Sequence, residues 1–261
     1  MKTLLAFLAS IFLSVVFASP SFAQDEVKLV RAENYITTGY HTYIGWEVKA
    51  LIQVKNLAYT KQVYLHLSKT DGTWVDIPAH YVRTANSTYE LWEVNRSDFG
   101  DYSMPGKYYA IKYVVNGQTY WDNNNGANYI FSNYGGYGPG PMLGNSINVL
   151  SYYNYTTIQD GKFQGYVDVR NIAYSKKVSI VYTTDNWATY ATVDSSFMGS
   201  ISTGYSSFIA FPNVYNVERW KFEVPVTASQ VKYAVSYTVN GVTYWDNNYG
   251  ANYTANLYKV K

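Results

Sequence analysis

A ten-residue stretch rich in aromatic and amide side chains occurs twice in this chain. It reads Tyr-Trp-Asp-Asn-Asn-Asn-Gly-Ala-Asn-Tyr at residues 120–129 and returns at residues 244–253, with Tyr249 in place of one Asn. Each copy follows an Asn-Gly pair that is set between runs of Val, Tyr and Thr. Both residues of such a pair take positive φ in the tight turn of a hairpin. Each copy is therefore predicted to be the returning strand of a β-hairpin that runs out into an Asn-rich loop.

The rest of the chain repeats in the same order. Residues 45–59 and 163–174 alternate with period two and end on Asn-Leu-Ala-Tyr or Asn-Ile-Ala-Tyr, and residues 90–94 correspond to 218–222. A period of roughly 115 to 128 residues is too long for a solenoid unit and indicates two whole domains in tandem. Each copy holds about eight short strands without helical periodicity, which predicts an all-β fold of two β-sandwiches.

The segments before and between the two copies set the predicted domain boundaries. A lysine, an apolar run and small residues at the start are typical of a secretory signal, so we expect a secreted, extracellular protein. The Gly- and Pro-rich segment between the copies is typical of a linker. The predicted divisions are a signal peptide at 1–23, a first module at 24–131, a linker at 132–146 and a second module at 147–261.

Composition excludes several classes of partner. The net charge is +2 with only 15% charged residues, which argues against nucleic acid as a ligand because nucleic-acid binders gather Lys and Arg on one face. No segment is long and apolar enough for a confident membrane span. The chain has no cysteine, so its stability must come from its cores. No cofactor is expected, and the oligomeric state is left open.

The repeated motifs suit a sugar. Tyr and Trp offer a flat apolar face to the CH face of a pyranose ring, and an Asn amide both donates to and accepts from hydroxyl groups. Charges are of little use against a neutral polymer. These residues therefore indicate binding of a neutral glycan rather than catalysis.

Two separated motifs, each found twice, resemble carbohydrate-binding module family 21, a family of starch- and glycogen-binding modules with an immunoglobulin-like β-sandwich. They are Trp-Asp-Asn-Asn-x-Gly-x-Asn-Tyr and an upstream Asn-x-Ala-Tyr-x-Lys-x-Val. The second copy looks especially similar to the starch-binding domain of certain fungal glucoamylases. The resemblance covers nearly all of the chain after the signal and implies an α-glucan or malto-oligosaccharide as partner.

The resemblance implies two sugar sites in each module. One uses a loop Trp, the Trp of the repeated stretch and two of its asparagines: Trp74, Trp121, Asn123 and Asn128, then Trp187, Trp245, Asn247 and Asn252. The other uses the Asn-x-Ala-Tyr-x-Lys corner and a Glu: Asn56, Tyr59, Lys61 and Glu90, then Asn171, Tyr174, Lys176 and Glu218. One departure is that Ala110 and Ala234 stand where the family has a contacting tyrosine. The neighbouring Tyr109 and Tyr233 should face the other side of their strands.

Structural explanations stand beside these roles. Asn and Gly are ordinary turn residues because they tolerate positive φ, so the Asn-rich loop is also consistent with turn chemistry. Trp92 and Trp220 lie in mid-strand and are expected in the core. Trp74 and Trp187 lie in polar loops, where an apolar ring has less structural reason to be. Without the resemblance, the lysines and glutamates of the corner would be read as solvated surface charges.

The remaining candidates are weaker. His41, His66 and His80 lack the spacing and partners of a metal site and are interpreted as surface or strand residues. Glycosylation sequons occur at Asn86, Asn95, Asn154 and Asn252. Because Asn252 lies inside the binding motif, we expect it to be unmodified or its site to be lost.

Four functions remain open at this stage. The leading one is a non-catalytic protein that binds starch or glycogen through two modules. An adhesive or wall-associated glucan-binding protein is the alternative. A glycoside hydrolase would need a pair of carboxylates in a cleft, and neither copy shows one. A phosphatase-targeting scaffold is disfavoured by the signal and by the lack of an Arg-Val-x-Phe motif.

Overall fold

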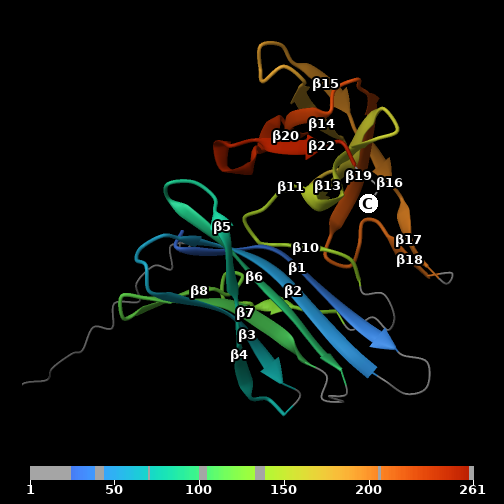
Figure 1. Cartoon of the computed structure of the whole chain (residues 1–261). Coiled ribbons are helices and arrows are strands. Elements are labelled where there is room, and N and C mark those ends of the chain that lie inside the picture. Colours follow the sequence, from blue (N-terminus) through green and yellow to red (C-terminus); the bar gives the residue numbers. More distant parts are fainter. Residues whose placement is uncertain are drawn as a thin grey trace, which may run out of the picture.

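The computed structural model describes residues 25–38, 44–69, 71–99, 105–132, 139–204 and 207–258. The predicted signal peptide therefore lies outside the described residues. Two β-sandwiches follow one another along the chain, as Figure 1 shows. The predicted all-β fold is confirmed, and its only helices in the described ranges are two single turns of 3₁₀-helix. No helix of the described part is long and apolar enough to cross a membrane.

The first module contains two sheets. One has the order β10-β1-β2-β6-β5, and the other has the order β4-β3-β7-β8, with β9 also paired to β7. Neighbouring strands are antiparallel throughout. The strands are β1 (Val27–Thr38), β2 (Ile44–Lys55), β3 (Lys61–Lys69), β4 (Trp74–Pro78), β5 (His80–Thr84), β6 (Tyr89–Phe99), β7 (Pro105–Val115), β8 (Gln118–Asp122), β9 (Tyr129–Ile130) and β10 (Met142–Leu143).

The second module repeats this plan. Its sheets have the orders β11-β13-β19-β16 and β15-β14-β20-β21, with β12 on β13 and β22 on β20, and a separate β17–β18 hairpin projects from it. Its elements are β11 (Val149–Ser151), η1 (Tyr153–Tyr155), β12 (Thr157–Gln159), β13 (Lys162–Arg170), β14 (Lys176–Thr183), β15 (Ala191–Asp194), β16 (Ser196–Met198), β17 (Ser200–Gly204), β18 (Ser207–Ala210), β19 (Val217–Pro225), β20 (Gln230–Val239), β21 (Val242–Asp246), η2 (Asn248–Gly250) and β22 (Tyr253–Asn256).

Alternation along the strands builds one core per module. In β2, Val48, Ala50, Ile52 and Val54 are buried against the opposite sheet, while the residues between them face outward. Tyr109 and Tyr233 also point into their cores, as the sequence predicts. Burying an apolar side chain of this size contributes about 1.5–3 kcal/mol, so two such cores can hold the fold without disulfides.

The Asn-Gly turns are as predicted. Asn116 and Gly117 have φ of 51° and 72°, and Asn240 and Gly241 have φ of 50° and 76°. These angles fit a tight turn between β7 and β8 and between β20 and β21. The turns bring Trp121 back toward Trp74, which is the first residue of β4 and not part of a loop as predicted, and bring Trp245 back toward the loop after β14 that carries Trp187.

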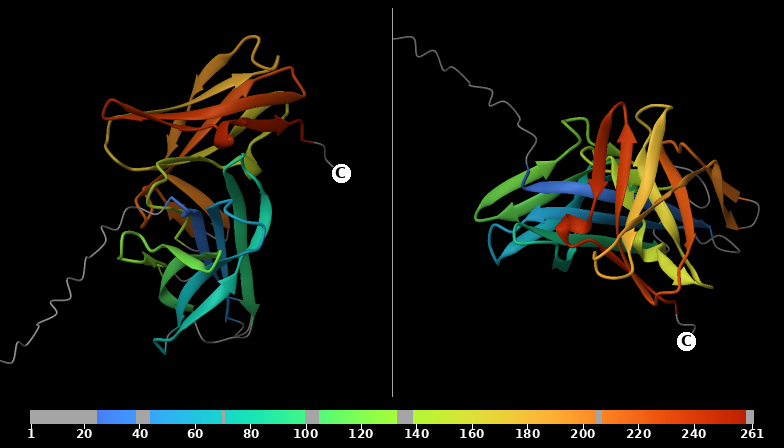
Figure 2. Two further views of the ribbon diagram at one scale, coloured as in Figure 1. Left: turned by 90° about the vertical axis from the view of Figure 1, so that its left-hand side faces the viewer. Right: turned by 90° about the horizontal axis from the view of Figure 1, so that it is seen from above.

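The two modules are stacked in contact with each other (Figures 1 and 2). Within the predicted linker, Met142–Leu143 pairs with β1 as the edge strand of the first module. At one end of the contact, the guanidinium of Arg31 lies over the ring of Tyr152 at 4.1 Å and 3.6 Å from a carboxylate oxygen of Asp168. Asp168 in turn accepts two hydrogen bonds from Arg219, at 2.7 and 2.8 Å. The outer face of the first sheet is thereby covered by the second module.

Candidate functional site

The bend between β2 and β3 presents a fully exposed tyrosine, Tyr59. Beneath it, the Nζ of Lys61 donates to Asn56 Oδ1 at 2.5 Å and to Glu90 Oε2 at 2.8 Å. Trp92 Nε1 donates to the same carboxylate oxygen at 3.0 Å. We call this group the corner of the first module. The hydrogen bond between Lys61 and Asn56 closes the bend, and the buried pair with Glu90 fixes it, so the exposed tyrosine projects from a rigid bend.

The second module has the same corner. Tyr174 is fully exposed, and Lys176 Nζ donates to Asn171 Oδ1 at 2.5 Å and to Glu218 Oε1 at 2.8 Å. Trp220 Nε1 donates to Glu218 at 3.1 Å. The predicted corner residues are thus brought together in both modules. The lysine and glutamate side chains are nearly buried, so the structure gives them a positioning role, and direct sugar contact by them stays a prediction.

The corner is suited to stacking. A tyrosine ring that projects wholly into solvent does not stabilise the fold by packing, and its whole face is open to a ligand. Such a ring can cover the apolar face of one pyranose, and the Asn amide beside it can bond the hydroxyl edge. Trp92 and Trp220 pack against the cores, as expected of mid-strand tryptophans.

A second aromatic group lies on the outer face of the β3–β7 sheet in the first module. The ring of Trp74 stacks on His66 with centroids 4.8 Å apart and an interplanar angle of 11°, and Trp121 meets His66 edge-on at 5.1 Å. We call this group and its counterpart in the second module the Trp surfaces. His66 is paired with Ala110 across the strands, so the histidine ring lies beside the position where the family has its tyrosine.

His66 is held by charges that the second module lacks. His66 Nδ1 and Lys112 Nζ each lie 2.6 Å from an oxygen of Asp76. Burial alone would raise the pKa of Asp76, but hydrogen bonds from Lys112 and His66 bring it below its ordinary value. At the corresponding strand positions the second module has Val181, Thr192 and Ser236. The Trp surface of the first module is therefore partly filled by its own side chains.

The two Trp surfaces expose different rings. Trp245 of the second module is 56% exposed while its counterpart Trp121 is half-buried, and Trp74 of the first module is 39% exposed while its counterpart Trp187 is half-buried. Trp187 has a φ of 73°, a conformation that is rare for a bulky residue and that must be held by its surroundings. Its amide donates to Thr183 Oγ1 at 3.0 Å within a turn closed by Asp185. The turn thus fixes Trp187 in a conformation that costs free energy.

The Asn-rich loops are largely explained by turn geometry. Asn123 and Asn247 each accept a hydrogen bond from the amide of a following glycine, at 3.0 Å. Asn128 and Asn252 have φ of 58° and are half-buried. All four lie in the loop that follows the Trp of the repeated stretch. The turn hydrogen bonds and the positive φ angles already explain why Asn occurs at these positions. Their contact with sugar stays a prediction.

The aspartate of the repeated stretch is structural. Asp122 accepts from the backbone amide of Leu29 at 2.7 Å, and Asp246 accepts from that of Ser151 at 2.7 Å. Burial raises the pKa of Asp246 in spite of these hydrogen bonds. Each carboxylate ties the hairpin end to the first strand of the opposite sheet. This role explains the residue without any contact to a ligand.

Sequence reasoning missed two rings beside the corners. Tyr81 meets Trp92 edge-on at 5.9 Å, and Phe197 meets Trp220 in the same way at 5.9 Å. Both rings are about half exposed and lie on the matching edge strands β5 and β16. The sequences around them do not match between the copies, so only the strand pairing reveals that they correspond. Among the described residues no group of His, Asp or Glu could hold a metal ion.

Comparison with known proteins agrees with this geometry. The family described as carbohydrate/starch-binding module (family 21) matches residues 28–132 and 143–256. Protein phosphatase 1 regulatory subunit 3C of Bos taurus is 35% identical over 102 residues, which cover 37% of this chain and 29% of the relative. Glucoamylase 1 of Rhizopus oryzae is 37% identical over 113 residues, which cover 42% of this chain and 16% of the relative. The chain thus spans less than a third of either curated relative.

One solved structure is the starch-binding domain of Rhizopus oryzae glucoamylase in complex with β-cyclodextrin and maltoheptaose. It is 38% identical in sequence, covers 41% of this chain and 92% of its own, and has a TM-score of 0.31. The two matched ranges of the family together include both corners and both Trp surfaces. This chain belongs to carbohydrate-binding module family 21 and carries the module twice.

Proposed function

We propose that this protein is a secreted, non-catalytic protein that binds starch- or glycogen-type α-glucans through its two modules. The observation that carries the proposal is the duplicated corner. Tyr59 and Tyr174 are both fully exposed and project from bends that the same Lys–Glu–Asn hydrogen bonds close in both copies. An exposed ring on a rigid, repeated support serves a ligand better than it serves the fold.

The relatives support the choice of ligand. One is a glucoamylase, and another relative is the glycogen-binding subunit 76A of Drosophila melanogaster, 34% identical over 92 residues that cover 12% of that protein. Both names point to α-linked glucose polymers. Secretion rests on the signal-like start of the sequence alone. Intact-mass analysis of the exported protein tests it, because cleavage after residue 23 removes a defined mass.

Two modules on one chain favour binding to a particle that presents many glucan chains on its surface. Once one module is attached, the second meets the polymer at an effective concentration near the millimolar range, which raises avidity by about 10² to 10⁴. The stacked arrangement fixes the directions of the corners relative to each other. A granule or a branched particle offers chains in many directions, so both modules can bind at once.

The test is depletion from solution by insoluble starch. We expect the wild-type protein to be depleted, and the Tyr59→Ala/Tyr174→Ala variant to be depleted clearly less, because both stacking rings of the corners are lost. Tyr190→Ala is the matched control, since Tyr190 is exposed but lies outside the corners and the Trp surfaces. Wild-type protein that stays in solution, or a double variant depleted as fully as wild type, would contradict the proposal.

The rival functions have separate readouts. Binding to a glycan array that favours β-linked glucans over α-linked ones would indicate the adhesive or wall-associated alternative. Release of reducing sugar from amylose by the purified protein would indicate an enzyme. We propose no catalysis because the two corner glutamates, Glu90 and Glu218, are each already paired with a lysine and a tryptophan.

A further inference from the structure

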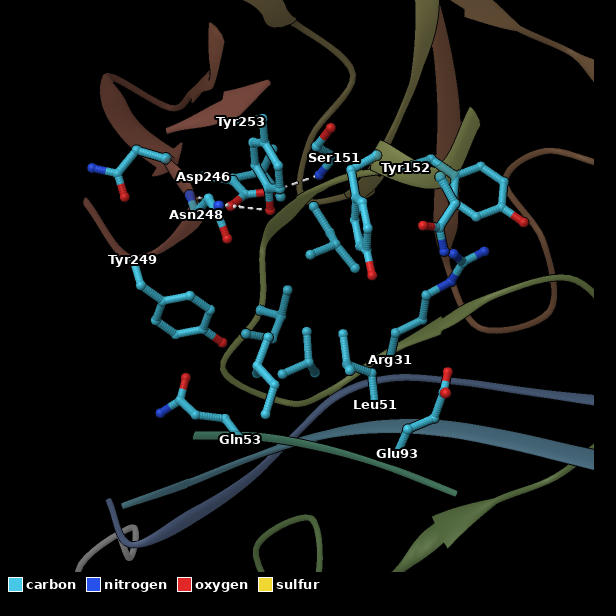
Figure 3. A pocket seen from close by; sticks show the side chains of 18 of the residues that line it. Arg31, Leu51, Gln53, Glu93, Ser151, Tyr152, Asp246, Asn248, Tyr249 and Tyr253 are labelled. Carbon is cyan, nitrogen blue, oxygen red and sulfur yellow. Dashed lines mark hydrogen bonds between the residues drawn. The ribbon is translucent and has the colours of Figure 1, made fainter. Parts of the chain in front are cut away.

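A pocket of about 720 Å³ lies between the two modules. Its floor is the outer face of β1, β2 and β6 of the first module, and its roof is formed by β11, η1, β21, η2 and β22 of the second. Figure 3 shows Tyr249 at one end and Arg31 at the other. The volume lies within the range of small-molecule sites, which is about 300–1,000 Å³. No single module contains this pocket.

Contacts between the modules hold both ends of the pocket. At one end, Arg31 reaches the ring of Tyr152 and the carboxylate of Asp168. At the other, Tyr249 packs beside Tyr89, with ring centroids 6.5 Å apart, and Arg83 donates a hydrogen bond to Asn248. Tyr249 is the residue that replaces an Asn of the repeated stretch, so the departure from the repeat has a structural purpose. The pocket is therefore a defined part of the structure, with contacts between the modules at both of its ends.

The lining suits a neutral ligand with many hydroxyl groups. Its charges balance, with three cations (Arg31, Lys49 and Arg83) and three acids (Glu33, Glu93 and Asp246). Aromatic and amide side chains make up much of the remainder, namely Tyr152, Tyr153, Tyr155, Tyr249, Tyr253 and Trp245, with Gln53, Asn154, Asn247, Asn248 and Asn252. Aromatic faces with amides are the same chemistry that the corners use, whereas an ionic ligand would require an excess of one charge.

Gln53 supplies an unmet hydrogen-bonding group. Its residue is only 7% exposed, and its side chain makes no hydrogen bond within the described part of the chain. Figure 3 shows this amide on the floor of the pocket, below Tyr249. The amide faces the pocket and is not fully enclosed by the protein, so its hydrogen-bonding groups are open to a ligand. A sugar hydroxyl can both donate to and accept from the amide.

We propose that this inter-module pocket binds a segment of α-glucan chain and so forms a glucan site that the two modules share. The proposal rests on the proposed function, because it assigns the same class of ligand to a further site, which shares Trp245 with the Trp surface of the second module. Tyr153 and Tyr155 are about half exposed and give rings for the pyranose faces. Gln53, Arg83 and Glu93 from the first module meet the hydroxyl edge. A bound chain touches both modules and fixes their relative position.

The test uses calorimetric titration of the full chain, produced without N-glycans, with maltoheptaose. The parent variant is Tyr59→Ala/Trp74→Ala/Tyr174→Ala/Trp187→Ala, which removes an aromatic ring from each corner and each Trp surface. We expect the parent to retain one binding site per chain. Adding either Gln53→Leu or Tyr155→Ala should weaken that site about tenfold or more, equivalent to about 1.4 kcal/mol. Tyr190→Ala and Gln62→Leu, both at exposed positions outside the pocket, should change it less than about twofold.

The outcomes separate the two proposals. If wild type is depleted by starch but the parent retains no site, the shared site is wrong and the proposed function stands. If wild type binds neither starch nor maltoheptaose, the proposed function is wrong, and the shared site falls with it. A second measurement guards against misfolded variants. The side-chain amide resonances of Gln53 should shift when maltoheptaose is added to the parent, and their failure to move would overturn the shared site.

Discussion

The rings of His66 and Trp74 are stacked, with their centroids 4.8 Å apart and their planes within 11°. One face of the Trp74 indole is therefore covered by a side chain of the protein itself. The second module has Val181 at the position of His66. The two Trp surfaces differ in this respect although the motifs around them repeat.

Replacement of His66 by the residue of the other module should open the first Trp surface. An aromatic pair of this kind contributes about 0.5–1.5 kcal/mol, so His66→Val should raise the affinity of this surface for maltoheptaose about two- to tenfold. The titration is carried out in the Tyr59→Ala/Tyr174→Ala background to remove the corners. Unchanged or weaker binding would mean that His66 is itself part of the platform.

The buried ion pair of the corner should be essential for stability. Lys176 and Glu218 have side chains that are 3% and 9% exposed, so Lys176→Met leaves a buried carboxylate without its charge partner. The expected loss in the free energy of unfolding is about 3–5 kcal/mol, measured by urea denaturation.

Lys162 gives the matched control in the same module. Its pair with Glu223 is exposed, with side chains 48% and 34% accessible, and Lys162→Met should leave the free energy of unfolding nearly unchanged because water screens such a pair. Equal effects of the two substitutions would show that the corner pair is not a buried support.

The turn that carries Trp187 should keep its form in acid. Hydrogen bonds from the side chain and backbone of Thr189, and from the hydroxyl of Thr183, lower the pKa of Asp185 to about 2. A lowered pKa stabilises the folded turn above the ordinary value of 3.8, and this contribution is lost as the pH falls through about 2. Thr189→Val removes the hydroxyl donor and should move the pKa of Asp185 upward. NMR titration of the Asp185 carboxyl measures this, and a pKa near 3.8 in the wild type would contradict it.

Arg31 should hold the modules together. Arg31→Met removes the charge that lies over Tyr152 and near Asp168, while Asp168 keeps its two hydrogen bonds from Arg219 inside the second module. We expect both modules to stay folded and the radius of gyration, measured by small-angle X-ray scattering, to increase. Lys28→Met, which removes only an exposed pair with Asp25, should leave the radius unchanged. A variant as compact as wild type would show that other contacts suffice.

Local patterns predicted much of the fold. The Asn-Gly pairs specify the turns at Asn116 and Asn240 because few residue pairs take positive φ twice in succession. Period-two alternation identified β2 and β13 and the bends after them, whereas the residues of the corners were assigned only through the resemblance to the family. These features depend on neighbouring residues, so they can be read from a short stretch of sequence.

Contacts between distant strands could not be predicted in this way. His66 joins Trp74 and Trp121 only through the register of β3, β4, β7 and β8. Arg31 and Asp168 lie in different modules, and the sequence around neither residue indicates that the two side chains meet. Tyr249 could be recognised as a departure from the repeat, but its partner, Tyr89, becomes apparent only once the modules are stacked.

The central claim is that exposed tyrosines at two repeated corners bind α-glucan. The most direct measurement is calorimetric titration of maltoheptaose into the full-length wild-type chain and into the Tyr59→Ala/Tyr174→Ala variant. The account predicts that wild type binds, and that the variant loses two sites per chain while urea denaturation shows unchanged stability. The same number of sites with the same affinity in both proteins would contradict it.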